Sequence, residues 1–301
     1  MFQSIHLRRG LASGLVCICI LLGIAGCDST ETDAQMSRDH VDAMAREHAN
    51  DTSNASDGAR IAPRYAVISE RLPYVEVDNK LVYGYFVFPS DMVEPLPAII
   101  VIHEWWGLND NVRAMADRLA SEGYIVLAVD LYAGKTATNA EVARHMMLSV
   151  VENSAAAVHN IRRAYAFVSE TAGAPSIGSL GWCFGGGWSL NMAMLFPDDL
   201  DATVIYYGQI TDDEEKLRPI NVPILGLFGA DDTGISVQSV RRFEEALERL
   251  RKKYEIHIYP GVGHAFANPS GNNYNAEAAD DAWMRTLEFF GRNLVDDTDD
   301  S

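Results

Sequence analysis

The sequence predicts an α/β fold with a mostly parallel central sheet and helices on both faces, over residues 61–295. Short, continuous apolar runs recur along this region and alternate with longer segments of helical periodicity. That alternation is typical of parallel strands that are buried on both faces and joined by crossover helices. The chain has 301 residues, 48% of them hydrophobic and 22% charged, which suffices for one sizeable core.

The elements follow one another in a regular order. Two strands at 74–77 and 81–89 form a predicted hairpin, because Asp78-Asn79 between them favours a tight turn. Gly123 and Pro197 mark the ends of two helices. Buried strands are predicted at 98–103, 124–130, 176–182, 202–207, 222–229 and 255–259. Helices are predicted at 112–122, 139–150, 154–171, 186–196, 237–253 and 277–294.

The N-terminal 26 residues are expected to be a lipoprotein signal peptide. Two arginines precede an apolar stretch over 11–24 that is short for a transmembrane helix. The closing Ile24-Ala25-Gly26-Cys27 looks like a bacterial lipobox, in which Cys27 is acylated and anchors an exported protein to a membrane of the cell envelope. An ordinary cleaved signal with an incidental cysteine is the alternative. The sequence leaves open whether the anchor lies in the inner or the outer membrane.

Residues 27–60 and 296–301 are expected to lie outside the folded domain. The first segment is rich in Asp, Glu, Ser, Thr and Asn, so it is expected to be an acidic flexible tether, and the second an acidic tail. His40 and His48 fall within the tether and are set aside as catalytic candidates. The net charge of −18 makes nucleic acid an unfavourable partner, because phosphate backbones would repel the chain.

Cys183 is the strongest candidate for a catalytic nucleophile. It lies in Gly181-Trp182-Cys183-Phe184-Gly185, between a predicted strand and a predicted helix. Gly-x-nucleophile-x-Gly at such a junction is the pattern of the nucleophile elbow of α/β-hydrolases. The helix that starts there favours a thiolate. A buried, inert structural cysteine is the alternative.

An acid and a base follow Cys183 in the chain order of α/β-hydrolases. His264, in a Gly-Val-Gly-His loop after the last strand, is the best base among eight histidines. Asp232 would orient its imidazole and stabilise the imidazolium. The neighbouring Asp231 remains a competitor for that role.

Five segments in register resemble the dienelactone hydrolase family, from about residue 70 to residue 295. They are His103-Glu104-Trp105-Trp106-Gly107, Asp130-Leu131-Tyr132-Ala133, the elbow segment continued to Gly186, Gly229-Ala230-Asp231-Asp232 and Gly261-Val262-Gly263-His264-Ala265-Phe266. The resemblance implies an α/β-hydrolase fold and hydrolysis of small carboxylic esters or lactones through a thioester acyl-enzyme.

The resemblance also implies roles for single residues. In this family the acid stands three residues after the strand-terminal glycine, which selects Asp232. A glutamate at the position of Glu104 contacts the thiol and takes part in switching it to a thiolate. The backbone N–H groups of Trp105 and Phe184 are expected to form the oxyanion hole.

The chain departs from the family at the substrate carboxylate. The two arginines that bind it there are replaced here by Gly134 and Asn268, and Lys135, next to Gly134, offers only a point charge. The sequence therefore favours a neutral or weakly polar ester or lactone. The expected pocket is lined by Lys135 and by the aromatic side chains of Trp105, Trp106, Tyr132 and Phe266.

Two other functions remain open on the same fold. One is a non-catalytic envelope protein that binds a ligand, and the other is a thiol-redox protein that uses Cys183. The sequence contains no recognisable metal-ligand motif, phosphate-binding glycine loop or basic stripe, so no cofactor is expected. The oligomeric state is left open.

Overall fold

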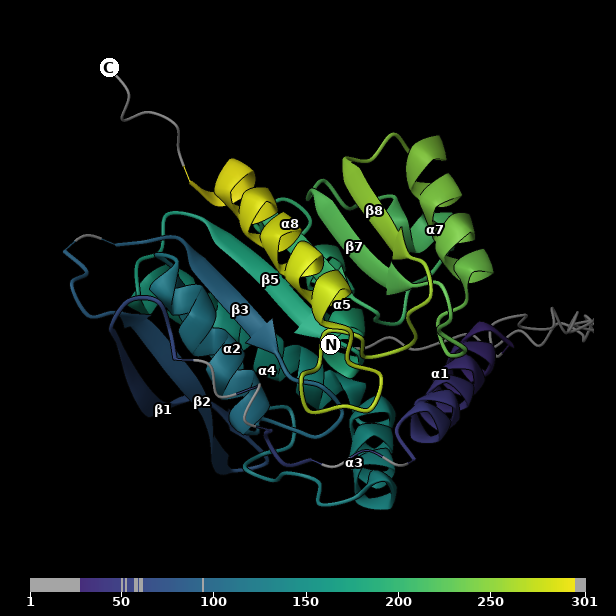
Figure 1. Cartoon of the computed structure of the whole chain (residues 1–301), viewed down its shortest axis with the longest axis horizontal. Coiled ribbons are helices and arrows are strands. Elements are labelled where there is room, and N and C mark those ends of the chain that lie inside the picture. The colour runs from purple at the N-terminus through teal and green to yellow at the C-terminus, as the bar shows by residue number, and fades with distance from the viewer. Residues whose placement is uncertain are drawn as a thin grey trace, which may run out of the picture.

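The computed structural model describes residues 28–295, apart from residues 50, 52, 57, 58, 60, 61 and 94. Within these residues the strands form an eight-stranded sheet in the order β1-β2-β4-β3-β5-β6-β7-β8 (Figure 1). The two junctions of β2 are antiparallel and all the others are parallel. The strands are β1 (Val67–Val77), β2 (Lys80–Pro89), β3 (Ala98–Ile102), β4 (Ile125–Val129), β5 (Ile177–Trp182), β6 (Ala202–Tyr206), β7 (Ile224–Gly229) and β8 (Tyr254–Tyr259).

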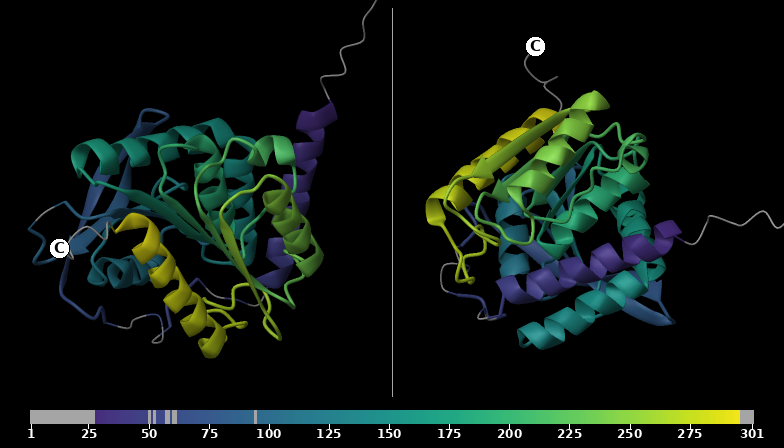
Figure 2. Two further views of the ribbon diagram at one scale, coloured as in Figure 1. Left: turned by 90° about the horizontal axis from the view of Figure 1, so that it is seen from above. Right: turned by 90° about the vertical axis from the view of Figure 1, so that its right-hand side faces the viewer.

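The helices lie on both faces of this sheet. Helices α2 and α8 cover one face and α4 and α5 the other (Figures 1 and 2). Every residue of β3, β4 and β5 is buried between these layers, as the continuous apolar runs predict. The helices are α1 (Asp28–Glu47), α2 (Asp110–Ser121), α3 (Ala140–Glu152), α4 (Ser154–Ala166), α5 (Phe184–Leu195), α6 (Glu214–Leu217), α7 (Val237–Arg249) and α8 (Ala276–Leu294), with a π-helical turn over Phe167–Thr171.

Local sequence accounts for where many of these elements begin. The side chains of Asn109, Asn139 and Asn275 accept hydrogen bonds from the first turns of α2, α3 and α8. Asp78 and Asn79 both have positive φ, at 49° and 59°, in the turn between β1 and β2. The predicted hairpin is confirmed, and the predicted α/β class with a mostly parallel sheet is confirmed with it.

The segment before the sheet differs from the expected flexible tether. From residue 28 the chain forms α1, which lies beside α3 (Figure 2). Val41 and Met44 on α1 are fully buried, and Asp42 pairs with Arg144 of α3 at 2.6 Å. The composition of this segment does not predict the packing of α1. A largely polar helix can pack through a single apolar stripe when the folded domain provides a surface for it.

Three expectations fall on residues that lie outside the described part of the chain. These are the signal peptide over 1–26, the lipidation of Cys27 and the acidic tail over 296–301. Among the residues that are described, no helix combines the length and the apolar character needed to cross a bilayer.

Candidate active site

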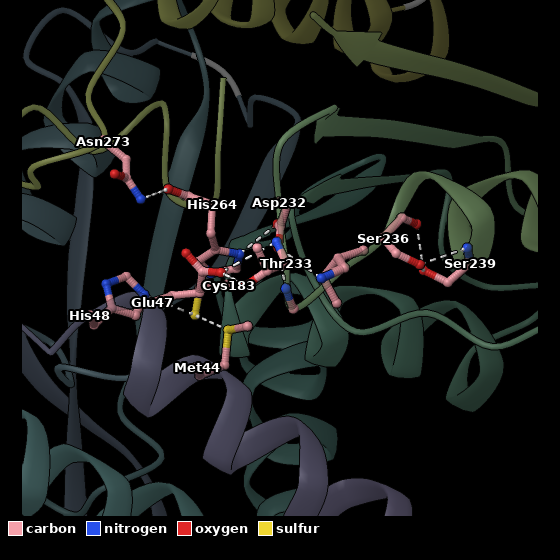
Figure 3. A network of polar contacts seen from close by, with 12 residues as sticks. Met44, Glu47, His48, Cys183, Asp232, Thr233, Ser236, Ser239, His264 and Asn273 are labelled. Atoms are coloured by element: carbon pink, nitrogen blue, oxygen red, sulfur yellow. Dashed lines mark hydrogen bonds and ion pairs between the residues drawn. The ribbon is translucent and has the colours of Figure 1, made fainter. Parts of the chain in front are cut away.

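The four residues that the sequence selects for catalysis follow the carboxyl ends of four parallel strands. Glu104 comes after β3, Cys183 after β5, Asp232 after β7 and His264 after β8. Because parallel strands end at the same edge of the sheet, the fold brings these side chains to one region. Figure 3 shows Cys183, His264 and Asp232 pointing toward one another there.

The elbow holds Cys183 in a backbone conformation that few residues adopt. Its φ is 54° and its ψ is −118°, and its N–H donates to the carbonyl of Tyr206 at 3.0 Å. The flanking glycines are required by space. A Cβ on Gly181 would collide with the backbone of Gly185, and one on Gly185 with the carbonyl of Ile102. The turn therefore forms only with glycine on both sides of the cysteine.

Asp232 and His264 form a buried pair. The Nδ1 of His264 donates to Oδ2 of Asp232 at 2.7 Å, and both side chains are excluded from solvent. The other oxygen of Asp232 accepts the backbone N–H groups of Gly234 and Ile235. Asp231 is exposed, so the geometry places Asp232, not its neighbour, against the imidazole. The remaining ring nitrogen of His264, Nε2, is buried without a hydrogen-bond partner among the described residues.

A second histidine, which sequence reasoning set aside, reaches the thiol from the N-terminal segment. The Nε2 of His48 lies 3.8 Å from Sγ of Cys183, and its Nδ1 donates to Asp51 at 2.8 Å. The ring stacks on Trp105 at 4.8 Å between centroids. Met44, one helical turn earlier, places its sulfur 3.6 Å from Sγ (Figure 3). In the sequence, the only indication of these contacts is the four-residue spacing that puts Met44 and His48 on one helical face.

These contacts control the ionisation of the thiol. Burial by itself raises the pKa of Cys183, but the charges of His264 and His48 and the hydrogen bond with His48 outweigh it and lower the pKa from 9.0 to about 6. Burial lowers the pKa of His264, yet the thiolate and Asp232 raise it well above its ordinary value. Burial also opposes the charged form of His48, and its bonds to Asp51 and Cys183 raise its pKa to about 9. The site therefore favours a thiolate beside imidazolium.

Glu104 is buried and held by an amide. Burial raises its pKa, the nearby charge of Cys183 raises it further, and the result is about 7. The side-chain amide of Asn268 donates to Oε2 of Glu104 at 2.9 Å. Asn268 occupies one of the positions where the resemblance leads us to expect a substrate-binding arginine. In this chain the side chain at that position donates a hydrogen bond to Glu104.

The other predicted site residues differ in burial and in position relative to the thiol. Phe184 begins α5, where first-turn N–H groups lack helical partners, and Trp105 is fully buried beside His48. The side chains of Trp106, Tyr132 and Phe266 are also buried, and Tyr132 donates its hydroxyl to the carbonyl of Trp105 at 3.1 Å. Lys135 instead lines a separate surface cavity of about 710 Å³ whose lining omits the thiol. The expected pocket is thus not open.

The N-terminal segment covers the thiol. Glu47 accepts hydrogen bonds from the N–H and hydroxyl of Thr233, next to Asp232. Beyond the turn, Asp51 accepts the N–H of Asn272 at 3.0 Å. The N–H of Ser56 donates to the Ser270 hydroxyl at 2.8 Å. We refer to the described residues between 38 and 56, without 50 and 52, as the cover; beneath it Cys183 has no exposed surface.

The strand order, the crossover helices and the strained cysteine at an elbow define an α/β-hydrolase fold. The profile of the dienelactone hydrolase family matches residues 82–294. A presumed carboxymethylenebutenolidase of Saccharolobus solfataricus is 31% identical over 260 residues, covering 74% of this chain and 98% of its own. One from Escherichia coli is 32% identical, covering 69% and 81%. The chain belongs to the dienelactone hydrolase family.

A solved structure agrees with this assignment. The crystal structure of a presumed dienelactone hydrolase from Klebsiella pneumoniae superposes with a TM-score of 0.69 at 26% identity. It covers 75% of this chain and 99% of its own. The cover lies ahead of the family match. The residues that close the site therefore come from outside the part of the chain that defines the family.

Proposed function

We propose that this protein hydrolyses small, neutral carboxylic esters or lactones through Cys183, His264 and Asp232. The observation that supports this most directly is the position of His264. Its Nε2 is buried without a partner among the described residues, and a ring nitrogen of His264 lies within 4.8 Å of the Cys183 sulfur. The opposite ring nitrogen is fixed by Asp232. A histidine held in that way has one nitrogen available to take a proton from the thiol and to return it later.

The reaction follows from these positions in two steps. The thiolate of Cys183 attacks the carbonyl carbon, and the tetrahedral oxyanion is stabilised by the N–H groups of Trp105 and Phe184. The carbon–oxygen bond to the leaving alcohol breaks as the imidazolium of His264 donates its proton, which leaves a thioester. Water then attacks the thioester while His264 accepts one of its protons, and the acid leaves with the thiol restored.

Glu104 is proposed to set the resting state of the thiol. A carboxyl group whose pKa is about 7 exchanges a proton near neutral pH. A carboxylate there would oppose a neighbouring thiolate, and a neutral carboxyl would not. Asn268 fixes the carboxyl in place by donating to Oε2. We infer that this pair adjusts the thiol and does not bind substrate.

The preference for a neutral substrate rests on the missing arginines. Gly134 has no side chain to offer, and the amide of Asn268 is already bonded to Glu104. Lys135 lines the surface cavity and not the region around the thiol. A carboxylate on the substrate would therefore enter a buried region without the bidentate partner that would compensate its desolvation.

We further propose that the protein acts at the cell envelope, exported and held to a membrane through lipid on Cys27. The Ile24-Ala25-Gly26-Cys27 segment is what supports this. Expression of the full chain followed by membrane fractionation tests it. We expect the protein in the membrane fraction, and a Cys27→Ser variant in the soluble fraction. Wild-type protein that is entirely soluble after processing would contradict anchoring.

Hydrolysis itself is tested with the full chain and a para-nitrophenyl ester of a short fatty acid. We expect release of nitrophenol by the wild type and at least about a thousandfold loss for Cys183→Ala, because the nucleophile is removed. His145→Gln is the matched control, since this histidine is exposed on α3. Equal rates for wild type and Cys183→Ala would refute the proposal.

A further inference from the structure

We propose that the side chains of Met44, His48, Cys183 and His264 form a binding site for one copper ion in its Cu⁺ state. The ring nitrogens of the two histidines and the cysteine sulfur all lie within 4.8 Å of one another, and all three residues are buried. The thioether of Met44 lies 3.6 Å from the same sulfur. This site goes beyond hydrolysis and does not depend on it.

The spacing of the donor atoms suits a single ion. Bonds of about 2.3 Å to sulfur and about 2.0 Å to nitrogen place tetrahedral ligand atoms about 3.3–3.8 Å apart. The sulfur of Cys183 is 3.8 Å from Nε2 of His48 and 3.6 Å from the sulfur of Met44. The ring nitrogen of His264 lies within 4.8 Å of the other donors, so it must approach by up to about 1.3 Å for one ion to contact all of them.

Both histidines are oriented in the manner typical of metal ligands. His48 donates its Nδ1 proton to Asp51, and His264 donates its Nδ1 proton to Asp232. A carboxylate on one ring nitrogen fixes the tautomer, so that the other nitrogen presents its lone pair. In His264 the other nitrogen, Nε2, is buried and has no hydrogen-bond partner among the described residues, so it is available to a cation once its proton has left.

The four donors favour copper over other metals. A thiolate and a thioether are soft ligands, which select Cu⁺, and imidazole also binds copper. Zinc sites use thiolate, imidazole and carboxylate but not thioether. The site is also closed to water, because Cys183, Met44 and His48 are all buried. Figure 3 shows Met44 and His48 next to the thiol.

Hydrolysis does not explain the donors that the cover supplies. An acid, a base and a nucleophile suffice for that chemistry, and they are Asp232, His264 and Cys183. Met44, His48 and Asp51 lie ahead of the family match, yet they bring two ligands and an orienting carboxylate to the same sulfur. When Cu⁺ binds, copper–sulfur and copper–nitrogen bonds form, and the protons held by the thiol or by the imidazolium nitrogens leave to solvent. The nucleophile is then blocked.

The test is competition for Cu⁺ between the full chain and the chromogenic chelator bicinchoninate, under anaerobic reducing conditions. We expect the wild type to retain one equivalent more than Cys183→Ser. Cys17, Cys19 and Cys27 are present in both proteins, so the difference reports Cys183 alone. We expect His48→Gln to weaken retention about 10- to 100-fold or more, and the exposed-site control His145→Gln to leave it unchanged.

Two measurements separate loss of a ligand from loss of the fold. Circular dichroism of each variant shows whether it is folded. X-ray absorption at the copper edge is expected to show two sulfur neighbours in the wild type and one in Met44→Leu, a substitution of similar size and shape. Retention by wild type no greater than by Cys183→Ser would overturn the site, as would a folded His48→Gln with unchanged affinity. Tighter retention of Zn²⁺ than Cu⁺ would overturn the choice of copper.

Discussion

At the scale of single residues, the arrangement around Cys183 depends on which of two adjacent aspartates is bonded to His264. Asp232 is buried and bonded to His264, whereas Asp231, one position earlier, is exposed. Two adjacent residues of identical chemistry therefore have different environments. This difference offers a controlled experiment in which side-chain type is constant and only position changes.

We expect Asp232→Asn to lower kcat for ester hydrolysis by about 10³- to 10⁴-fold, because the amide would hold the wrong tautomer of His264. Asp231→Asn is the matched control and should change kcat by less than about twofold. Steady-state kinetics with the nitrophenyl ester measure both. If Asp231→Asn caused the larger loss, the assignment of the acid would be wrong.

The ionisation of Cys183 gives a second prediction for single residues. Its pKa is lowered to about 6, so ultraviolet thiolate absorbance, taken as wild type minus Cys183→Ser, should fall as pH decreases through about 6. Because the pKa in the folded state lies below 9.0, its value for an ordinary thiol, ionisation stabilises the fold at high pH. This contribution is complete above about pH 9 and declines as pH falls toward about 6.

The same titration tests the contribution of His48. Removing its positive charge and hydrogen bond should raise the pKa of Cys183, so the midpoint for His48→Gln should shift to higher pH. His145→Gln should leave the midpoint in place. A midpoint near 9 in the wild type would show that the thiol is not activated by its surroundings.

At the scale of elements, the junction of β5 with α5 is the most constrained part of the fold. We expect Gly185→Ala to reduce the free energy of unfolding by about 4 kcal/mol or more, because the new Cβ would overlap the carbonyl of Ile102. Gly291→Ala is the control. Gly291 lies in α8 with open space around it, so alanine there should stabilise by about 0.5–1 kcal/mol. Urea denaturation measures both.

The cover gives a further prediction at this scale. Arg144 of α3 pairs with Asp42 of α1, and this ion pair helps to hold α1 in place. Loss of a partly exposed ion pair should favour the displaced position of α1 by up to about fivefold. Arg144→Ala should therefore increase the rate of Cys183 alkylation by iodoacetamide by up to about fivefold. Arg241→Ala removes a comparable pair within α7 and serves as the control. Equal alkylation rates in the two variants would show that α1 does not limit access.

At the scale of the whole molecule, we expect net charge and the closed site to act together on substrate choice. The chain carries a net charge of −18 and has Gly134 and Asn268 at the positions where the resemblance implies arginines. We therefore expect a higher kcat/KM for para-nitrophenyl acetate than for the matched hemisuccinate ester, which carries a carboxylate. Added salt should narrow the difference by screening repulsion. A preference for the charged ester would contradict a neutral substrate class.

The local features of this protein follow from sequence because local sterics and burial produce them. Apolar runs became buried parallel strands, and Gly181 and Gly185 flank a cysteine at a turn that no larger residue allows. Both of these depend on neighbours within a few residues. The convergence of the site residues depends on the rule that parallel strands end together. The choice of Asp232 over Asp231 came from the resemblance to the family, and in the structure Asp232 is bonded to His264.

What the tertiary structure alone decided is the environment of the thiol. His48 lies 135 positions from Cys183, in a segment whose polar composition indicates no fold, and the contact forms because the domain buries Met44 and Val41. The hydrogen bond from Asn268 to Glu104 is likewise a product of tertiary packing. Contacts between distant residues depend on how whole surfaces pack, and packing free energy is not encoded in any short stretch of chain.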